Sequence, residues 1–437
     1  MSFYKIQKLL TVHCLGAKLI STSKYASVNI TRVERQNIRK GEAFVKYNFD
    51  EVVNRRNTYS LKWDGESLIK ELGFTNRYDE DTIPLFTADM DLPVPQPLID
   101  ALHKTVDHRI YGYSVIPDEY YEAIRHWFQK RHDWEIKKEE IVYSPGTVHA
   151  LHVAVKAFTE PGDGIIIQRP VYPPFTSAIE GNGRRVVNNP LICDEEGYYS
   201  IDFEDFEAKA KEDGTTMYIL CHPHNPTGRI FTSEELQKLA DICARNDVLI
   251  IADEIHGDLI RRNQRFIPLV KAAANHSEHI ITCTAINKTF NTAGLHCTNV
   301  IIPNEELRSR FKQEQGMSLP SPFTIAALIA VYNEGEEWLE QVKAYIDETM
   351  DDVQTFLAER MPQVKVRIPE GTYVMWMDFS GYGLSPEEVH ERIYHKANVI
   401  LEDGSMFGQE GLPFQRICVP SPRSLIKEAL ERIAREF

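Results

Sequence analysis

The sequence lacks three features that would each point to a particular class of protein. It has no uninterrupted apolar run close to the roughly 18 residues that a membrane-spanning helix needs. Its seven cysteines are scattered, odd in number and without C-x-x-C spacing, so neither a disulfide framework nor a zinc cluster is indicated. It also has no internal repeat and no low-complexity tract. Because such cysteines are typical of a reducing compartment, we expect the protein to be cytoplasmic and not bound to a membrane.

Basic residues are also scarce. The chain has 49 Lys and Arg against 64 Asp and Glu, a formal net charge of −15. A protein that binds the phosphate backbone needs a basic surface, so we expect no nucleic-acid partner. The remaining composition, 43% hydrophobic and 26% charged over 437 residues, is ordinary for a soluble enzyme of two or three domains.

Short apolar runs alternate with helical patterns from about Ile141 onward, which is typical of a largely parallel sheet covered by helices. Apolar residues at i, i+3, i+4 and i+7 predict helices around Leu151–Phe158 and Leu236–Cys243, and Thr232–Glu235 forms a plausible capping box for the second. The expected strands are Ile141–Tyr143, Ile165–Ile167, Met217–Leu220, Val248–Ile251, Ile280–Ile281 and Val300–Ile302.

The pattern changes after about Pro320. A long helical stretch from Phe323 to Met361 precedes two strand-like runs, 364–368 and 373–379, which predicts a second, smaller α+β domain. We therefore expect an α/β protein with a large domain over residues 91–325 and a small domain over residues 326–437.

Four polar residues follow four of the expected strands. They are Thr147, Asn225, Asp253 and Lys288. In open α/β sheets, ligands bind beyond the carboxyl ends of the strands, so these side chains are expected to share one rim.

Lys288 is the most informative of the four. A lysine at the end of a buried strand is unfavourable unless it is neutralised, and a Schiff base with an aldehyde cofactor neutralises it. If that cofactor is an aldehyde of the pyridoxal type, Asp253 would keep its pyridine nitrogen protonated, and Asn225 would donate to its phenolic oxygen. Taken singly, Asp253 has the alternative of a helix cap and Asn225 that of a turn.

Three segments together carry a family resemblance. His222–Arg229, Ala252–Asp258 and Cys283–Leu295 resemble fold type I pyridoxal 5'-phosphate enzymes of the class I/II aminotransferase superfamily. The stretches 86–91, 253–256 and 288–291 further resemble the C-S β-lyase subgroup, cystathionine β-lyases of the MalY/PatB type. The similarity runs from about Lys46 to Phe437.

The resemblance implies a fold and an assembly. The large domain would bind pyridoxal phosphate on a mainly parallel sheet of the seven-stranded type, and residues 46–90 would pack with the small domain. The protein would be a homodimer with shared active sites, in which Tyr113 reaches the neighbouring subunit's site.

The resemblance also assigns roles to further residues. Tyr172 would stack on the cofactor, His256 and Thr284 would contact it, and Arg423 would bind the substrate carboxylate. Gly146, Thr147 and Val148 begin a helix whose N–H groups and dipole suit a phosphate, although a capped turn is the alternative.

Three positions depart from the family pattern. Asn287 replaces the hydroxyl residue before the lysine in close relatives, and Ala285 and His296 replace a phosphate-binding serine and arginine of many aminotransferases. The paired histidines 149/152 and 222/224 lack a third ligand, so no metal is expected.

The expected reaction is β-elimination. Lys288, freed when the substrate amine displaces it from the cofactor, would remove the α-proton of cystathionine or a related cysteine S-conjugate, and a thiol, pyruvate and ammonia would result. The alternatives are an aminotransferase, which uses the same residues, and a regulatory protein that binds the cofactor with little turnover.

Residues 1–45 fall outside the resemblance. They hold eight Lys and Arg but only two acidic residues, Glu34 and Glu42. A basic, acid-poor segment is also typical of an organellar transit peptide. Because the remainder looks bacterial, we favour a start at Val45, which makes the preceding segment translated upstream sequence or a disordered extension. The intact mass of the natively expressed protein tests this interpretation, since a chain beginning at Met1 would refute a start at Val45.

Overall fold

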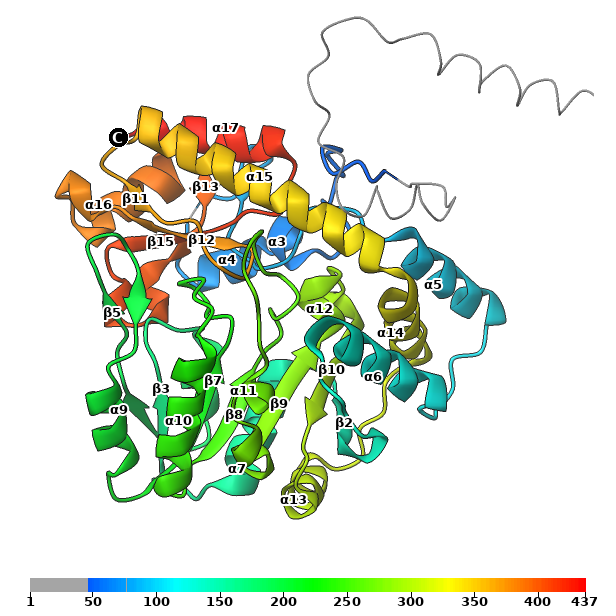
Figure 1. Cartoon of the computed structure of the whole chain (residues 1–437). Coiled ribbons are helices and arrows are strands. Elements are labelled where there is room, and N and C mark those ends of the chain that lie inside the picture. Colours follow the sequence, from blue (N-terminus) through cyan, green and yellow to red (C-terminus); the bar gives the residue numbers. More distant parts are fainter. Residues whose placement is uncertain (1–45, 76) are drawn as a thin grey trace, which may run out of the picture. The chain divides into compact units, whose positions relative to one another are not determined.

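The apolar runs form a seven-stranded sheet with the order β2-β10-β9-β8-β7-β3-β4 (Figure 1). The computed structural model describes residues 46–75 and 77–437, so the predictions for residues 1–45 lie outside it. All six expected strands are present, and β4 is an addition at the sheet edge. The strands are β2 (Ile141–Ser144), β3 (Gly164–Ile167), β4 (Arg185–Asn188), β7 (Thr215–Cys221), β8 (Leu249–Asp253), β9 (Ile280–Ala285) and β10 (Thr298–Ile301).

Strand direction brings four carboxyl ends to one rim. β3, β4, β7, β8 and β9 are parallel, whereas β10 is antiparallel to both β9 and β2. β2 therefore runs in the same direction as β9. The residues that follow β2, β7, β8 and β9 meet at the same edge of the sheet.

Helices cover both faces of this sheet because its strands are apolar on both sides. Ile251 of β8 packs with Leu151 and Phe175, while the preceding Ile250 packs with Leu236 on the opposite face. Both stripe-based helix predictions are confirmed, and so is the capping box at Thr232. The helices are α5 (Gln96–His108), α6 (Asp118–His132), α7 (Thr147–Phe158), α8 (Pro174–Glu180), α9 (Phe203–Ala210), α10 (Ser233–Arg245), α11 (Leu269–Ala272), α13 (Glu305–Gln315) and α14 (Pro322–Glu334).

A smaller domain follows α14. Its antiparallel sheet has the order β11-β12-β15-β14, and α15 (Glu336–Arg360) lies beside α17 (Arg423–Ala434) (Figure 1). The helix expected from Phe323 to Met361 is broken at Gly335, where an added Cβ would lie 2.6 Å from the Phe290 ring. The remaining elements are β11 (Lys365–Val366), β12 (Val374–Asp378), α16 (Pro386–His390), β13 (Val399–Ile400), β14 (Glu402–Asp403) and β15 (Phe414–Cys418).

The segment before residue 91 contacts the elements that follow α14. β1 (Ile83–Pro84) pairs in parallel with β13, and the Tyr345 hydroxyl donates to Asp50 at 2.8 Å. Two short helices, α3 (Leu61–Asp64) and α4 (Glu66–Glu71), lie in this segment. Among the described residues, no helix combines the length and apolarity needed to cross a bilayer.

Candidate active site

Lys288 lies just beyond β9, in the short helix α12 (Ile286–Thr289). Its Nζ donates to the carbonyl of Ala88 at 2.6 Å, and the neighbouring Thr289 hydroxyl anchors the helix to Asp258 at 3.1 Å. Burial lowers the pKa of Lys288, and the nearby Arg416 lowers it further. A lysine with a lowered pKa holds more of the neutral amine, which is the form that acts as nucleophile or base.

Asp253 ends β8 and is buried. Burial raises its pKa to about 7, against smaller opposing effects of a hydrogen bond from the Ile255 N–H and of the Lys288 charge. That N–H lies 3.3 Å from Oδ1. A buried carboxylate held this way is stabilised by any cationic partner placed beside it.

Asn225 and Tyr172 lie on neighbouring loops at the same rim. The Tyr172 N–H donates to the Asn225 carbonyl at 3.1 Å, so the two loops are joined by their backbones. Burial raises the pKa of Tyr172 to about 12, and the charges of Glu402 and Asp253 add to the effect. The tyrosine is therefore neutral at physiological pH and close to both acids.

Arg416 joins this cluster, although the sequence did not indicate it. It lies on β15 with 2% of its side chain exposed, and its Nη1 donates to Asn225 Oδ1 at 3.1 Å. Its Nη2 donates to the Phe86 carbonyl at 2.8 Å and pairs with Glu402, while Nε is buried without a hydrogen-bond partner among the described residues. The strand reads Phe-Gln-Arg-Ile-Cys, and the burial of its arginine is visible only in the folded chain, so no sequence signal singled out Arg416.

Arg423, which the sequence predicts to bind the substrate carboxylate, lies outside this cluster. Its Nη2 donates to Glu348 at 2.6 Å, and its guanidinium lies 4.4 Å from the centre of the Tyr345 ring. The physical reason is that Arg423 is the first residue of α17, which packs against α15. Its side chain therefore lies along α15 instead of beside Lys288.

The phosphate-binding prediction falls at the start of α7. Gly146 is the N-cap, and Thr147 and Val148 are the first helical residues, whose N–H groups have no acceptor within the helix. The Thr147 hydroxyl lies 3.1 Å from that of Thr298 on β10. These N–H groups, the helix dipole and two hydroxyls form a suitable cradle for an anion.

Thr284 is placed differently from Thr147. Its hydroxyl donates to the Asn299 carbonyl on the adjacent strand at 3.2 Å, so it is engaged within the sheet. Thr298, which the sequence did not single out, is the threonine that accompanies Thr147. Side chains alternate along a strand, so only an exact register could have distinguished the two positions.

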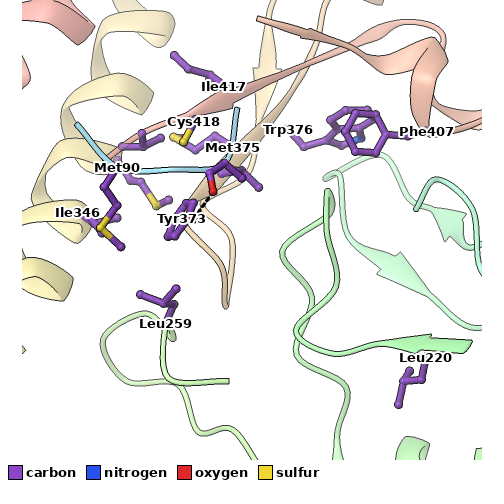
Figure 2. Packing of buried hydrophobic residues seen from close by; sticks show 14 of the residues in the cluster. Met90, Leu220, Leu259, Ile346, Tyr373, Met375, Trp376, Phe407, Ile417 and Cys418 are labelled. Atoms are coloured by element: carbon purple, nitrogen blue, oxygen red, sulfur yellow. Dashed lines mark hydrogen bonds between the residues drawn. The ribbon is translucent and has the colours of Figure 1, made fainter. Parts of the chain in front are cut away.

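His256 and Tyr373 form the wall next to Lys288. Their rings meet edge to face with centroids 5.5 Å apart. The Tyr373 hydroxyl donates at 2.7 Å to the same Ala88 carbonyl that Lys288 contacts. Figure 2 shows Tyr373 among the buried side chains of this region. Burial lowers the pKa of His256 well below its usual value, so the ring is neutral. Its Nδ1 is buried without a partner among the described residues.

Tyr113 lies apart from this cluster. Its side chain is fully exposed on the loop between α5 and α6, close in sequence to exposed Ile110 and Val115. The described part of the chain holds no group of three or more His, Cys, Asp or Glu side chains arranged to bind a metal ion.

Comparison with known proteins gives consistent results. Residues 80–433 match the family described as "Aminotransferase class I and II". The chain is 39% identical over 389 residues to cystathionine beta-lyase PatB of Bacillus subtilis, covering 88% of this chain and 98% of that protein.

Solved structures agree with the sequence comparison. Cystalysin of Treponema denticola, which contains a pyridoxal 5'-phosphate cofactor, has a TM-score of 0.85 at 34% identity and covers 90% of this chain and 99% of its own. The PLP-bound C-S lyase of Staphylococcus hominis has a TM-score of 0.83 at 34% identity and covers 90% and 98%. The chain therefore belongs to the aminotransferase class I and II family and, within it, to the subgroup represented by PatB.

Proposed function

We propose that the protein is a pyridoxal phosphate-dependent carbon-sulfur β-lyase that converts cystathionine or a related cysteine S-conjugate to a thiol, pyruvate and ammonia. The observation that carries the proposal is the placement of Lys288 and Asp253 at neighbouring strand ends, close enough for each charge to shift the other's pKa. The similarity to the cystathionine beta-lyase PatB and to the Staphylococcus hominis C-S lyase supports the reaction class.

The residues present fit the cofactor. Lys288 would bond to its aldehyde, Asp253 would pair with its pyridine nitrogen, and the α7 N-terminus with Thr147 would hold its phosphate. His256 Nδ1, which lacks a partner in the described part of the chain, and the loops of Asn225 and Tyr172 would supply polar and aromatic contacts for the ring. When bound, pyridoxal phosphate supplies an electron sink that stabilises the negative charge left by loss of the α-proton.

Arg416 is the residue of this site best suited to bind the substrate's α-carboxylate. It is buried, and its Nε has no hydrogen-bond partner within residues 46–75 and 77–437. Because Asn225 and Phe86 fix the guanidinium, a carboxylate bound there has a defined orientation relative to Lys288.

Lys288 would then act as the base. Its lowered pKa favours the neutral amine, which can take the α-proton at Nζ. The Ala88 carbonyl, 2.6 Å away, can accept a hydrogen bond from the protonated amine and hold it in place while the thiolate leaves.

The assembly proposed for this function is a cytoplasmic homodimer. Tyr113, Ile110, Val115 and Met317 are exposed, and the Ser114 hydroxyl donates to the Pro320 carbonyl, which joins the two segments that carry them. Exposed apolar side chains gathered on adjoining segments are typical of a protein interface. A second copy covering this surface would bring its Tyr113 toward the active site, as the family resemblance implies.

The test is an assay of the purified enzyme with L-cystathionine and no keto acid. The proposal predicts steady formation of pyruvate and a free thiol. Conversion of the cofactor to its pyridoxamine form without pyruvate would instead identify an aminotransferase. Cofactor absorbance with negligible turnover of any thioether would favour the regulatory alternative.

A further inference from the structure

Glu402 faces Arg416 across two hydrogen-bonded strands. β14 pairs with β15 so that Glu402 and Arg416 are direct partners in the antiparallel register. Such partners project from the same face of the sheet, and their Cβ atoms lie only about 4.5–5.5 Å apart. The two side chains form an ion pair in which 13% of Glu402 and 2% of Arg416 are exposed.

The strand pairing therefore holds the Glu402 carboxylate beside the Arg416 guanidinium, which is the group proposed to bind the substrate's α-carboxylate. Glu402 cannot swing to a distant position without breaking the β14–β15 pairing, whose second register pair is Asp403 with Gln415. An incoming carboxylate must share Arg416 with a carboxylate that is already present. Two carboxylates at one buried cation cannot both remain ionised at little cost.

The groups around Glu402 determine which acid takes a proton. Arg416 from β15 and Lys288 from α12 favour its ionised form, while burial acts more strongly in the opposite direction and raises its pKa. The hydroxyls of Tyr172, beyond β3, and Tyr394, in the helical turn Glu391–Lys396, also lie within electrostatic range. The α-carboxyl of an amino acid is the stronger acid, so Glu402 is the group that becomes protonated.

We propose that Glu402 is a built-in competitor for the substrate's α-carboxylate. It neutralises Arg416 while no amino acid is bound, and it takes up a proton when an amino acid binds there. The inference rests on the proposed function, because that function supplies the α-amino-acid ligand. It predicts that amino-acid binding weakens as the pH rises, since the required proton becomes scarcer.

The experiment measures L-alanine, which has no β-leaving group, binding to the cofactor-loaded enzyme. Calorimetry in two buffers with different ionisation heats gives the number of protons taken up. We expect Glu402→Gln to bind L-alanine about tenfold more tightly or better, and to take up about one proton fewer than the wild type. The difference between the two proteins removes the contribution of the ligand's own amine.

Glu410→Gln is the matched control. Glu410 lies eight residues after Glu402, between β14 and β15. Its carboxylate accepts a hydrogen bond from the Asn188 side chain at 2.7 Å instead of pairing with Arg416. The Glu410→Gln variant should bind L-alanine with the affinity of the wild type and take up the same number of protons. The pH dependence gives a second measurement: the dissociation constant of the wild type, relative to that of Glu402→Gln, should rise by up to about tenfold per pH unit.

The outcomes separate this inference from the proposed function. Equal or weaker L-alanine binding by Glu402→Gln, or equal proton uptake, overturns the role of Glu402 while cystathionine turnover by the wild type still stands. A wild-type enzyme that binds no amino acid and releases no pyruvate refutes the proposed function, and the role of Glu402 with it.

Discussion

Asp253 is a buried carboxylate whose charge is only weakly compensated by its neighbours. Replacing it by asparagine removes the partner proposed for the pyridine nitrogen, so we predict that Asp253→Asn lowers pyruvate formation about 100-fold or more. Glu254→Gln is the matched control, because Glu254 is equally buried and its Oε1 accepts from the Leu269 N–H, which a glutamine oxygen can also do. Comparable losses in both variants would contradict the assigned role.

The same residue predicts a pH effect on the cofactor-free protein. The pKa of Asp253 is raised from 3.8 to about 7, so the folded state holds its proton more tightly than the unfolded state. The resulting destabilisation is absent below pH 3.8 and complete above about pH 7. Cofactor-free Asp253→Asn should therefore have a higher Tm than the wild type near pH 8, and the gap should shrink toward about pH 5. A gap independent of pH would exclude this explanation.

The two candidate arginines can be distinguished by kinetics. Truncating a buried, hydrogen-bonded charge typically costs about 2–5 kcal/mol, so Arg416→Ala should raise KM for cystathionine by about 30-fold or more. Arg423→Ala should leave KM within about twofold, because that side chain pairs with the exposed Glu348. The reverse result would restore the original assignment of Arg423.

Residue identities were predictable where a motif is local. Lys288, Asp253 and Asn225 each follow a strand that the sequence shows clearly, so the rule for strand ends brought them together. Arg416 and Glu402 come from short strands after residue 400 and meet the rim only through tertiary packing. Arg416 and Arg423 are seven residues apart, and no local pattern indicates which one faces the site.

At the scale of elements, the segment before residue 91 supports the Ala88 carbonyl through buried charges. Asp91 accepts from Lys62 at 2.7 Å and from Arg55 at 2.6 Å, and Arg55 also pairs with Asp89. Lys62 is fully buried, and the positive charges hold the pKa of Asp91 down to about 2 against its burial. The stabilisation that the ionised Asp91 gains from these positive charges is complete above pH 3.8 and is lost as the pH falls through about 2.

Lys62→Met should therefore be strongly destabilising. Breaking a buried pair by removing one partner costs about 3–5 kcal/mol, and we expect a corresponding loss in the free energy of unfolding together with a lower kcat. Lys70→Met is the control, since Lys70 forms an exposed i,i+4 pair with Glu66 and should change stability by less than about 1 kcal/mol. Urea unfolding of both variants provides the comparison, and similar losses would argue against the role of Lys62.

Elements were predictable in kind but not at every boundary. The expected strands and helices were present because their apolar periodicity is strong. The break at Gly335 was missed because helical periodicity continues on both sides. A Cβ at this position would lie 2.5 Å from the Val331 carbonyl oxygen and 2.6 Å from the Phe290 ring, and this crowding exists only in the folded chain. β4 was missed because Arg185 and Asn188 give this edge strand little apolar character.

At the scale of the whole molecule, the exposed Ile110 and Tyr113 test the proposed dimer. Ile110 is 70% exposed, and a charge placed there should separate the subunits, so Ile110→Glu should sediment as an inactive monomer. Leu72→Glu, at a position 49% exposed at the end of α4, should remain a dimer. Tyr113→Phe should keep the dimer but bind pyridoxal phosphate more weakly. A wild-type protein that sediments as an active monomer would refute the assembly.

The central claim is a covalent bond between Lys288 and pyridoxal phosphate, and borohydride reduction followed by peptide mapping tests it most directly. The account predicts that the reduced cofactor remains attached to the peptide containing Lys288, and that Lys288→Ala carries no label and forms no pyruvate. A label on another lysine, or unchanged product formation by Lys288→Ala, would contradict it.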